Sequence, residues 1–466
     1  MLQQDFTTAR QLTLDERYLD AIQLYEKILL SEPAHVPSHY NLGLIAAKMG
    51  ELEKARTHFE TVIRLEPNFP QGHFQLAQIE LLEYKPLEAI TQLQIAVDLQ
   101  ADYTDARHLL ACTLMQQGKD REAAEQFETL LQRTPEHANG HLNFALLKFH
   151  LKEVEAAKQL LESAIALDPT LVEAHYHRGV IAMQQGNIER AILEMQETLD
   201  RQTDHFAANY NLAILYKMQH HYKLAVFYLK KAQALEPANE SIRFLLAAFE
   251  QQKTPLIAPK TFVQELFNHY ADTYDQHMEQ VLHYKTPAQL HELLNPYRHL
   301  LPQNPKILDL GCGTGLVGQY FQDLNAAFIG VDLADEMLTQ AKQKNIYQEL
   351  MNADILEYLK TTQEKFDLII ASDVLNYFGD LNPIFTACKR VLNPKGLLLF
   401  SIELTDQQDY FLHAHARFSH QSDYIKTIMQ ESFELLAEKT NTLRFQENNP
   451  VNGKVFLYQS LTSISH

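Results

Sequence analysis

Cysteine is scarce in this chain of 466 residues, and long apolar runs are missing. The three cysteines, Cys112, Cys312 and Cys388, lie far apart and show no metal-ligand spacing. They predict a reducing, cytoplasmic compartment and no metal site. No stretch of about 18 apolar residues occurs, and the first ten residues, MLQQDFTTAR, lack the apolar segment of a signal peptide. We therefore expect no membrane partner.

Clusters of lysine and arginine are also missing, although charged residues are common. The formal net charge is −19. Residues 1–250 hold 34 acidic and 23 basic residues, and the remainder holds 25 and 17, so both halves are acidic. A nucleic-acid-binding surface needs a basic patch or stripe. We therefore expect no nucleic-acid partner.

The chain is too long to fold around one hydrophobic core, and its first half is repetitive. Residues 1–252 repeat every 34 positions, and alanine recurs in each unit at Ala21, Ala55, Ala89, Ala123, Ala157, Ala191 and Ala225. A second column is small: Ala9, Gly43, Ala77, Ala111, Ala145, Gly179 and Ala213. A third is large and apolar: Tyr25, Phe59, Leu93, Phe127, Leu161, Met195 and Leu229. Proline ends five of the units, at Pro33, Pro67, Pro135, Pro169 and Pro237, and Gly50, Gly118 and Gly186 mark a turn inside alternate units.

These columns resemble the tetratricopeptide repeat over the whole first half. Two helices cross closely only where the residues at the crossing are small, and a large side chain fills the space beside them. One unit cannot bury its own apolar face, so neighbouring units stack into a solenoid. The resemblance implies an all-α array of seven repeats over residues 1–252. A capping helix from Asn239 to Gln252 would close it.

The resemblance further implies a concave groove that binds a protein or peptide. In this family the position two residues before the small column usually lines the groove, which here gives Asn41, Gln75, Leu109, Asn143, His177 and Asn211. Asn and Gln suit hydrogen bonds to a peptide backbone, and no column of Lys or Arg is present to clamp a carboxylate tail. The alternative is that the array packs only against the rest of the chain or a second copy of it. The sequence leaves the oligomeric state open.

A short linker and two helices precede the second domain, which we place at residues 262–466. The linker, residues 253–261, reads KTPLIAPKT, and its two prolines make it semi-rigid. Residues 262–281 have helical spacing, with Phe267, Tyr270 and Tyr274 on one face. A second leading helix is expected over residues 283–294.

The sequence ILDLGCGTG, residues 307–315, is the stretch around which the second half is organised. A short apolar run that ends in glycines predicts a buried parallel strand that leads into a helix. Glycine tolerates positive φ and lets a ligand approach bare backbone, so the turn predicts a ligand site. Asp309 is unusual because a buried carboxylate is costly unless it is paired. We expect it to face a cationic or donor group of the ligand.

Strands and helices alternate after Lys306 and predict a doubly wound parallel sheet. We expect strands at 306–310, 327–332, 347–351, 366–372 and 396–403, and helices at 316–323, 335–344, 355–361 and 381–392. The tail differs. Residues 433–445 and 455–461 read as two antiparallel strands joined across Asn452-Gly453, an Asn-Gly pair typical of hairpin turns.

Two cofactors fit the glycine-rich turn. Residues 313–318 satisfy G-x-G-x-x-G, and Asp332 follows 19 residues after Gly313, as in proteins that bind NAD(P). Against this reading, the predicted strand ends at Leu310, so the first functional glycine is Gly311. Asp309 would also repel a pyrophosphate, whereas it suits the amino group of a methionine moiety.

The motifs from Ile307 to Glu403 resemble, in order, those of class I S-adenosylmethionine-dependent methyltransferases. They are ILDLGCGTG, FIGVDLADEML, NADI, FDLIIASDVLNYFGDL and RVLNPKGLLLFSIE. The resemblance implies that Asp332 holds the ribose hydroxyls, that Leu333 lies against adenine, and that Asp354 and Ile355 bind the adenine edge. It implies further cofactor contacts for Asp309, Gly311, Cys312, Gly313, Gly315, Met337 and Ser372, and a covering helix that bears Tyr270 and Tyr274. Asp354 also suits the N-cap of the helix over 355–361.

The sequence defines the binding site of the methyl acceptor less well. The resemblance and the rule that ligands bind at the carboxyl ends of parallel strands point to Tyr284, Asn376, Tyr377, Glu403, Arg417 and His420. Arg417 would pair with an anionic substrate, and His420 is a weak candidate for the base. Enzymes of this class that methylate planar amines often carry Asn/Asp-Pro-Pro-Tyr/Phe after the fourth strand, where this chain has SDVLNY at residues 372–377. Oxygen, carbon or carboxyl acceptors are therefore favoured.

Four functions are compatible with these observations. The first is a methyltransferase whose repeats bind a protein or peptide that serves as its substrate. The second is a small-molecule methyltransferase that uses its repeats for assembly. The third is an interaction scaffold without catalysis, which the intact set of Asp309, Asp332, Asp354 and glycines disfavours. The fourth is an NAD(P)-dependent oxidoreductase.

Overall fold

The computed structural model describes residues 2–251, 254–446 and 449–462. It divides into two compact units, residues 1–208 and 209–466. The domain boundaries expected from the repeat pattern, at residues 252 and 261, stay predictions. Gln252, the expected end of the capping helix, and Lys253, the first linker residue, lie outside the described residues. In the described ranges, no helix is long and apolar enough to cross a lipid bilayer.

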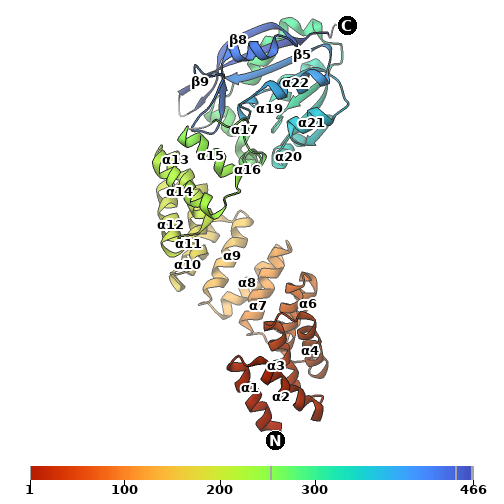
Figure 1. The fold of residues 1–466 in the computed structure, drawn as a ribbon, viewed down its shortest axis with the longest axis vertical. Helices are drawn as coiled ribbons and strands as arrows, with labels where there is room; N and C mark the ends of the chain where they lie inside the picture. The colour runs from red at the N-terminus through yellow and green to blue at the C-terminus, as the bar shows by residue number, and fades with distance from the viewer. Residues whose placement is uncertain (1, 252–253, 447–448, 463–466) are drawn as a thin grey trace. The chain divides into compact units, whose positions relative to one another are not determined.

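The first unit is all-helical (Figure 1). Its helices are α1 (Leu2–Leu14), α2 (Tyr18–Ser31), α3 (Val36–Lys48), α4 (Leu52–Leu65), α5 (Pro70–Leu82), α6 (Pro86–Leu99), α7 (Thr104–Gln116), α8 (Asp120–Arg133), α9 (Ala138–His150), α10 (Val154–Leu167), α11 (Val172–Gln184) and α12 (Ile188–Arg201). Consecutive helices pack as pairs of 13 and 14 residues, which confirms the helical repeat.

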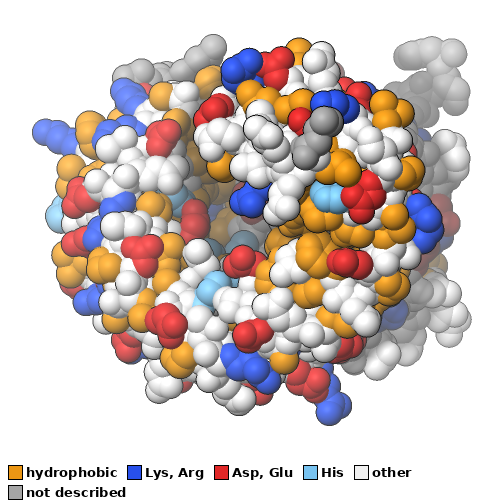
Figure 2. Space-filling view, turned by 90° about the horizontal axis from the view of Figure 1, so that it is seen from below, with side chains coloured by type: hydrophobic (Ala, Val, Ile, Leu, Met, Phe, Trp, Pro, Cys, Tyr) orange, Lys and Arg blue, Asp and Glu red, His pale blue; other side chains and the backbone are white. Residues whose placement is uncertain are grey.

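On the face shown in Figure 2, acidic and basic side chains are intermingled.

Small residues at the helix crossings hold the repeats together. Every member of the alanine column, from Ala21 to Ala225, is fully buried. Gly43 shows why this position stays small, because a Cβ there would lie 2.7 Å from the ring of Phe59, the large residue of the same repeat. At Gly179 a Cβ would lie 2.9 Å from Met195. The recurrence of small residues at these positions is therefore explained by the close packing of the helices.

A left-handed turn recurs inside each repeat. Gly50, Gly118 and Gly186 have φ of 77°, 68° and 71°, as their spacing suggested. The four remaining units place other residues at the same position, and these also have positive φ: Glu16, Tyr84, Lys152 and His220. A side chain in this region costs about 1–2 kcal/mol relative to glycine. Packing of the flanking helices thus imposes the turn even where the local sequence disfavours it.

The second unit begins with the last repeat helices and continues into an α/β domain. Its first helices are α13 (Phe206–Met218, shared with the first unit), α14 (Tyr222–Leu235) and α15 (Glu240–Glu250). Asn239 caps α15 by accepting from the backbone N–H of Ile242, so the capping helix begins as predicted. The covering segment follows as α16 (Lys260–Tyr270), η1 (Ala271–Thr273), α17 (Tyr274–Gln276) and the π-helical η2 (His277–Val281), and then come α18 (Thr286–Leu294) and η3 (Asn295–Leu300). The leading segment is thus helical but broken at Ala271.

The α/β domain is built on one seven-stranded sheet of order β3-β2-β1-β4-β5-β9-β8. Its strands are β1 (Lys306–Leu310), β2 (Ala327–Asp332), β3 (Glu349–Asn352), β4 (Phe366–Ala371), β5 (Leu392–Glu403), β8 (Phe433–Gln446) and β9 (Asn449–Ser460). β1 to β5 are parallel, and β9 and β8 close the sheet antiparallel. The helices between them are α19 (Leu316–Tyr320), η4 (Gln322–Leu324), α20 (Asp335–Gln343), α21 (Ile355–Thr361), η5 (Leu375–Tyr377), α22 (Asn382–Val391) and α23 (Ser422–Met429). The predicted fold class is confirmed.

The prediction for the turn of the closing hairpin is wrong. Asn452 and Gly453 lie within β9, paired with Thr442 and Asn441 of β8, and not in a turn. Gly453 is required for a different reason, because a Cβ there would clash with the carbonyl oxygen of Ile402 and with the side chain of Leu443. Close approach of three strands therefore explains this glycine. β5 also starts four residues before its predicted start, through pairing of Leu392 with Phe366, and the predicted helix at 316–323 is split into α19 and η4.

A small second sheet has no counterpart among the strands predicted from the sequence. β6 (Tyr410–Leu412) and β7 (Phe418–His420) form a two-stranded antiparallel hairpin between β5 and α23. Its turn, residues 413–417, contains Ala416 with φ of 64°. Strands of three residues carry too little alternation to be detected in a sequence.

We predict opposite stability effects at two equivalent turn positions. Tyr84→Gly removes the strain of a left-handed tyrosine whose side chain is 93% exposed, so it should raise the melting temperature. Gly118→Ala places a Cβ in open space but adds the strain, so it should lower stability by about 1 kcal/mol. Thermal unfolding followed by circular dichroism measures both. A lower melting temperature for Tyr84→Gly would contradict this account of the turn.

Candidate functional site

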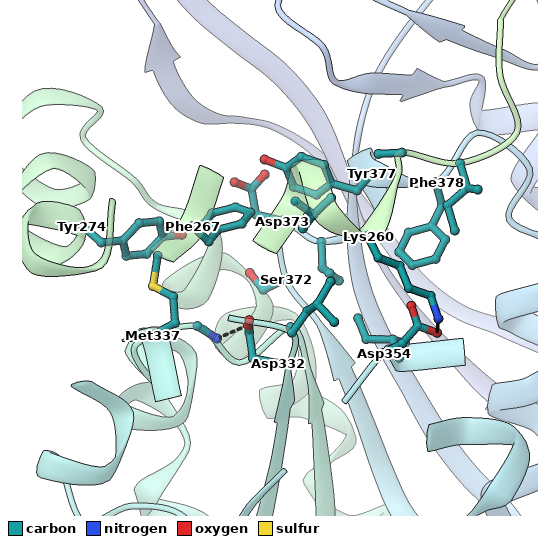
Figure 3. A pocket seen from close by; sticks show the side chains of 18 residues that line it. Lys260, Phe267, Tyr274, Asp332, Met337, Asp354, Ser372, Asp373, Tyr377 and Phe378 are labelled. Atoms are coloured by element: carbon teal, nitrogen blue, oxygen red, sulfur yellow. Dashed lines mark hydrogen bonds and ion pairs between the residues drawn. The ribbon is translucent and has the colours of Figure 1, made fainter. Parts of the chain in front are cut away.

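A cavity of about 730 Å³ lies at the carboxyl ends of the parallel strands. Its lining comprises Ile257, Ala258, Lys260, Val263, Phe267, Tyr274, Gly311, Gly313, Asp332, Leu333, Met337, Asp354, Ile355, Ser372, Asp373, Val374, Tyr377 and Phe378 (Figure 3). We call it the inner cavity. Nine of the residues predicted to bind cofactor line it: Gly311, Gly313, Asp332, Leu333, Met337, Asp354, Ile355, Ser372 and Tyr274. Residues from four strand ends and the covering helix are thus brought together.

The glycine-rich turn leaves bare backbone against this cavity. Gly311 and Gly313 have φ of 65° and 53°. A Cβ at Gly311 would lie 2.5 Å from Val374, whereas a Cβ at Gly313 would meet no atom within 4 Å. Gly311 is therefore needed for the packing of β1 against the loop after β4. Gly313 keeps the cavity wall open and its conformation unstrained.

Asp332 ends β2 and lies beside this turn. Its Oδ2 accepts a hydrogen bond from the backbone N–H of Gly313 at 2.8 Å, and its Oδ1 accepts from that of Ala334 at 2.9 Å. Burial raises the pKa of the carboxyl, and the two backbone donors act against this shift. Both oxygens keep lone pairs, so the carboxylate is held in place and can still accept from a ligand hydroxyl.

Asp354 lies across the cavity from the glycine turn and has the capping role that the sequence suggested. It accepts from the backbone N–H of Glu357 at 3.0 Å and so begins α21. Lys260, at the start of α16, lies 3.7 Å from Asp354 and 2.7 Å from Glu357. This contact fixes the start of the covering helix to the rim of the cavity.

The covering segment closes the cavity with aromatic side chains. Phe267 and Tyr274 line it and pack edge to face, with ring centroids 6.2 Å apart. Together with Tyr270 they pack on Ala271, Ala334 and Met337. Whether this segment covers a bound cofactor stays a prediction.

Four predicted cofactor residues lie outside the cavity lining: Asp309, Cys312, Gly315 and Tyr270. Asp309 is fully buried, and its Oδ2 accepts from the hydroxyl of Tyr347 at 2.7 Å. Its Oδ1 has no partner among the described residues. Burial raises the pKa of this carboxyl to about 7, the Tyr347 hydroxyl lowers it, and Asp332 raises it further. Whether Asp309 contacts a ligand stays a prediction.

A second cavity of about 610 Å³, which we call the acceptor cavity, adjoins the inner one. The two share Phe267, Tyr274, Asp373 and Tyr377. The rest of its lining is Phe262, Leu266, Tyr270, Met278, Leu282, His415, Ala416, Arg417 and Arg444. Of the residues predicted for the substrate pocket, Tyr377 and Arg417 line it. Tyr284, Asn376, Glu403 and His420 do not.

Two acids and two arginines form a buried network on the wall of the acceptor cavity. Asp373 Oδ1 accepts from Arg417 at 2.7 Å and from Arg444 at 3.1 Å. Glu403 Oε1 accepts from Arg417 at 2.8 Å and from Arg444 at 2.7 Å. Burial opposes the charge of Glu403, but the two arginines outweigh it and lower the pKa of its carboxyl to about 2. Asn376 donates to both acids. The four charges sum to zero.

The other predicted substrate residues support this wall or lie behind it. The hydroxyl of Tyr284 lies 2.8 Å from that of Ser372, at the edge of the inner cavity. His420 is fully buried, and its Nε2 contacts the carbonyl oxygens of Phe378 and Gly379 at 2.9 and 3.0 Å. Burial lowers the pKa of His420 to about 4. The Nε2 atom is thus occupied by contacts with backbone carbonyls. The sequence prediction therefore leaves the catalytic base unassigned.

Two residues of this wall, Asp373 and Arg444, are absent from the sequence prediction. Asp373 lies two residues after the end of β4, so the strand-end rule that pointed to Asn376 and Tyr377 could have selected it as well. Arg444 lies in β8 between Leu443 and Phe445, and an arginine flanked by two apolar residues suggests a buried charge partner.

The predicted groove residues, including Asn41, Asn143 and His177, are half-buried. Asn41 donates to the carbonyl of Pro37 in its own helix, and Asn143 donates to His108 and Cys112. His177 lies 3.8 Å from Glu173. These bonds occupy several of the amide donors that we expected to meet a peptide, and the peptide-binding role stays a prediction.

We predict that Asp309 makes stability depend on pH. Because the pKa is about 7 when folded and near 4 when unfolded, the folded protein binds the extra proton between these values. Wild-type stability should therefore fall as pH rises from 5 toward 7, by at most about 1.4 kcal/mol for each pH unit, and level off above. Asp309→Asn has no titrating carboxyl and should not lose stability in this way. The melting temperature of this variant minus that of the wild type should therefore increase as the pH rises. Asp335→Asn, at an exposed position, is the control. An equal difference at pH 5 and pH 8 would refute the assignment.

Comparison with protein families finds matches in both halves of the chain. Residues 308–400 match a family described as methyltransferase domain. Residues 36–69, 108–172 and 153–206 match tetratricopeptide repeat families. The first range holds the glycine-rich turn and the ends of β1 to β4, which form the inner cavity. These matches confirm the resemblances that the sequence motifs suggested.

Curated relatives match the methyltransferase region. One is a ubiquinone biosynthesis O-methyltransferase from Glaesserella parasuis, 30% identical over 153 residues, which are 28% of this chain and 65% of the relative. Another is a malonyl-[acyl-carrier protein] O-methyltransferase from Hamiltonella defensa, 35% identical over 95 residues, which are 20% of this chain and 36% of the relative. The chain thus spans less than two thirds of the length of either relative.

Solved structures resemble parts of the chain. A SAM-dependent methyltransferase from Methanosarcina mazei has a TM-score of 0.31 and 16% identity, and the match covers 36% of this chain and 98% of that one. The C-terminal part of a TPR repeat-containing protein from Cytophaga hutchinsonii has a TM-score of 0.43 and 17% identity over 51% of this chain and 98% of that one. The family matches alone show that the chain combines tetratricopeptide repeats with a methyltransferase domain.

Proposed function

We propose that this protein is an S-adenosylmethionine-dependent O-methyltransferase whose repeats bind a protein or peptide that carries the methyl acceptor. The observation that supports it most is the inner cavity, which gathers nine predicted cofactor residues at the carboxyl ends of the parallel strands. The oxygen acceptor is favoured by the two O-methyltransferase relatives and by the sequence after β4, which lacks the run typical of planar-amine enzymes. A cytoplasmic location remains part of the proposal.

The residues of the inner cavity fit the cofactor. Asp332 is held by backbone donors and keeps lone pairs for a ligand, as a ribose-binding carboxylate requires. Leu333 and Ile355 offer apolar contacts for adenine, and Asp354 offers an acceptor for its amino group. The open backbone at Gly313 leaves room for the methionine portion. When bound, S-adenosylmethionine supplies a methyl group on a sulfonium sulfur, which is electrophilic without further activation.

The protein contributes to the reaction mainly by aligning the methyl donor with the acceptor. A displacement of this kind is accelerated when donor and acceptor are held in line, and proton removal is needed only from a protonated acceptor. Phe267, Tyr274 and Tyr377 wall the junction between the two cavities and limit the entry of water. Asp373 lies at the same junction, with one oxygen fixed by Arg417, Arg444 and Asn376.

We predict that Asp332→Ala lowers the affinity for S-adenosylmethionine by at least about tenfold, since a hydrogen bond to a charged group contributes about 1.5–3 kcal/mol. Calorimetric titration of the full chain measures the affinity. Asp332→Asn keeps the side-chain size and tests whether the charge matters, and Asp335→Ala, on the exposed side of α20, is the matched control.

A parallel titration with NADH separates the cofactor hypotheses. Binding of S-adenosylmethionine that is lost in Asp332→Ala and kept in Asp335→Ala supports the proposal. Binding of NADH in place of S-adenosylmethionine would support the oxidoreductase alternative. If neither binds, the scaffold alternative gains support and the proposed function is refuted.

A further inference from the structure

A third cavity extends the acceptor cavity toward the last repeat helices within the second unit. We call it the outer cavity. It is lined by Tyr210, Asn211, Ile214, Lys217, Leu245, Phe249, Phe262, Glu265, Leu266, His269, His415 and Ala416. Phe262, Leu266, His415 and Ala416 also line the acceptor cavity. These four residues form a waist between the two cavities. The inner, acceptor and outer cavities therefore adjoin one another in that order.

The wall of the acceptor cavity disfavours an anionic acceptor. Arg417 and Arg444 each contact both Asp373 and Glu403, and Arg417 also donates to the hydroxyl of Tyr377 at 3.1 Å. A carboxylate that recruited either arginine would leave a buried acid without its partner, which costs several kcal/mol. The expected pairing of Arg417 with an anionic substrate is therefore unfavourable. An uncharged polar group meets no such cost.

The four side chains of the waist are uncharged near pH 7. Phe262, Leu266 and Ala416 are apolar. Burial lowers the pKa of His415 to about 4, so its imidazole is neutral near pH 7. Phe262, Leu266 and Ala416 offer a peptide backbone no side-chain hydrogen-bond partner, so an apolar side chain suits this passage better than a backbone does. The backbone of a peptide substrate therefore stays in the outer cavity, and only a side chain passes through.

These constraints select one residue type. The side chain must be long, apolar along its body and uncharged at its end. Among the protein side chains that carry a hydroxyl, tyrosine alone has the hydroxyl at the end of a long body. The aromatic walls formed by Phe267, Tyr270, Tyr274 and Tyr377 suit a ring, because aromatic pairs gain about 0.5–1.5 kcal/mol beyond their burial.

We propose that the methyl acceptor is the hydroxyl of a tyrosine in a peptide that lies in the outer cavity against helices α13 and α15. The phenolic O–H bond breaks and its proton is released to solvent. The oxygen forms the new O–CH₃ bond, and the broken S–CH₃ bond leaves its electron pair on sulfur. This inference rests on the proposed function and names its substrate class.

The test compares matched ligands in calorimetric titrations of the full chain saturated with S-adenosylhomocysteine. The probes are 4-methylphenol and 4-methylbenzoate, which differ in the charged end group, and the peptides acetyl-Gly-Gly-Tyr-Gly-Gly-amide and its glutamate counterpart. We expect 4-methylphenol to bind at least tenfold more tightly than 4-methylbenzoate, and the tyrosine peptide more tightly than the glutamate peptide. Incubation of the tyrosine peptide with S-adenosylmethionine should yield O-methyltyrosine by mass spectrometry.

Three variants locate the site. Leu266→Trp narrows the waist at a side chain that is 42% exposed, so the fold should be kept, and both 4-methylphenol and the tyrosine peptide should lose at least tenfold in affinity. Ile214→Trp, on α13, should weaken the peptide alone. Val281→Trp, 60% exposed and outside the lining of all three cavities, should change neither.

The outcomes separate this inference from the proposed function. Absence of S-adenosylmethionine binding in the wild type would refute the proposed function itself. With that binding intact, equal or tighter binding of the carboxylate probes overturns the inference, as does absence of O-methyltyrosine. Binding of 4-methylphenol without the peptide, or a peptide affinity unaffected by Ile214→Trp, would indicate a small phenol as the acceptor and overturn the peptide route.

Discussion

The turn after β1 is the constraint on which the functional half of the chain depends. Gly311 and Cys312 both donate to the carbonyl of Val331 in β2, and Gly313 donates to Asp332. Val374, after β4, packs so closely on Gly311 that no Cβ fits between them. Three strand ends are therefore held together by one turn. A substitution at Gly311 would displace the loop that carries Asp373 as well as the cofactor wall.

Charge in this domain is used in two different ways. Asp332 and Asp309 have no basic partner within the described ranges, and burial raises the pKa of both. Asp373 and Glu403 instead share two arginines in a network that is neutral overall. Buried ion networks add little stability compared with apolar packing, but removing one member is expensive. The network is thus better explained by the position it gives Asp373 at the junction of the two cavities.

Local sequence signals predict the architecture well where packing and pattern agree. The repeat columns, the parallel strands and the glycine turn are recovered because periodicity and positive φ leave direct traces in the sequence. The prediction of a turn at Asn452-Gly453 is wrong because this dipeptide occurs both in hairpin turns and where strands approach closely. Which of the two applies depends on the neighbouring strands. The network of Asp373, Glu403, Arg417 and Arg444 could not be foreseen, since its members come from strands and loops separated along the chain. His420 is over-valued because sequence alone does not show that its nitrogen is committed to backbone carbonyls.

The segment before α16 is held against the loop after β4 by main-chain hydrogen bonds. Leu256 accepts from Gly379, Ala258 donates to Tyr377, and Ile257 forms a bridge with Phe378. Ile257 and Ala258 themselves line the inner cavity. Any ligand of α15 that displaces this segment must then change the free energy of cofactor binding, and thermodynamic reciprocity requires the cofactor to change that ligand's affinity by the same factor. These main-chain contacts are the ones through which such a coupling would act.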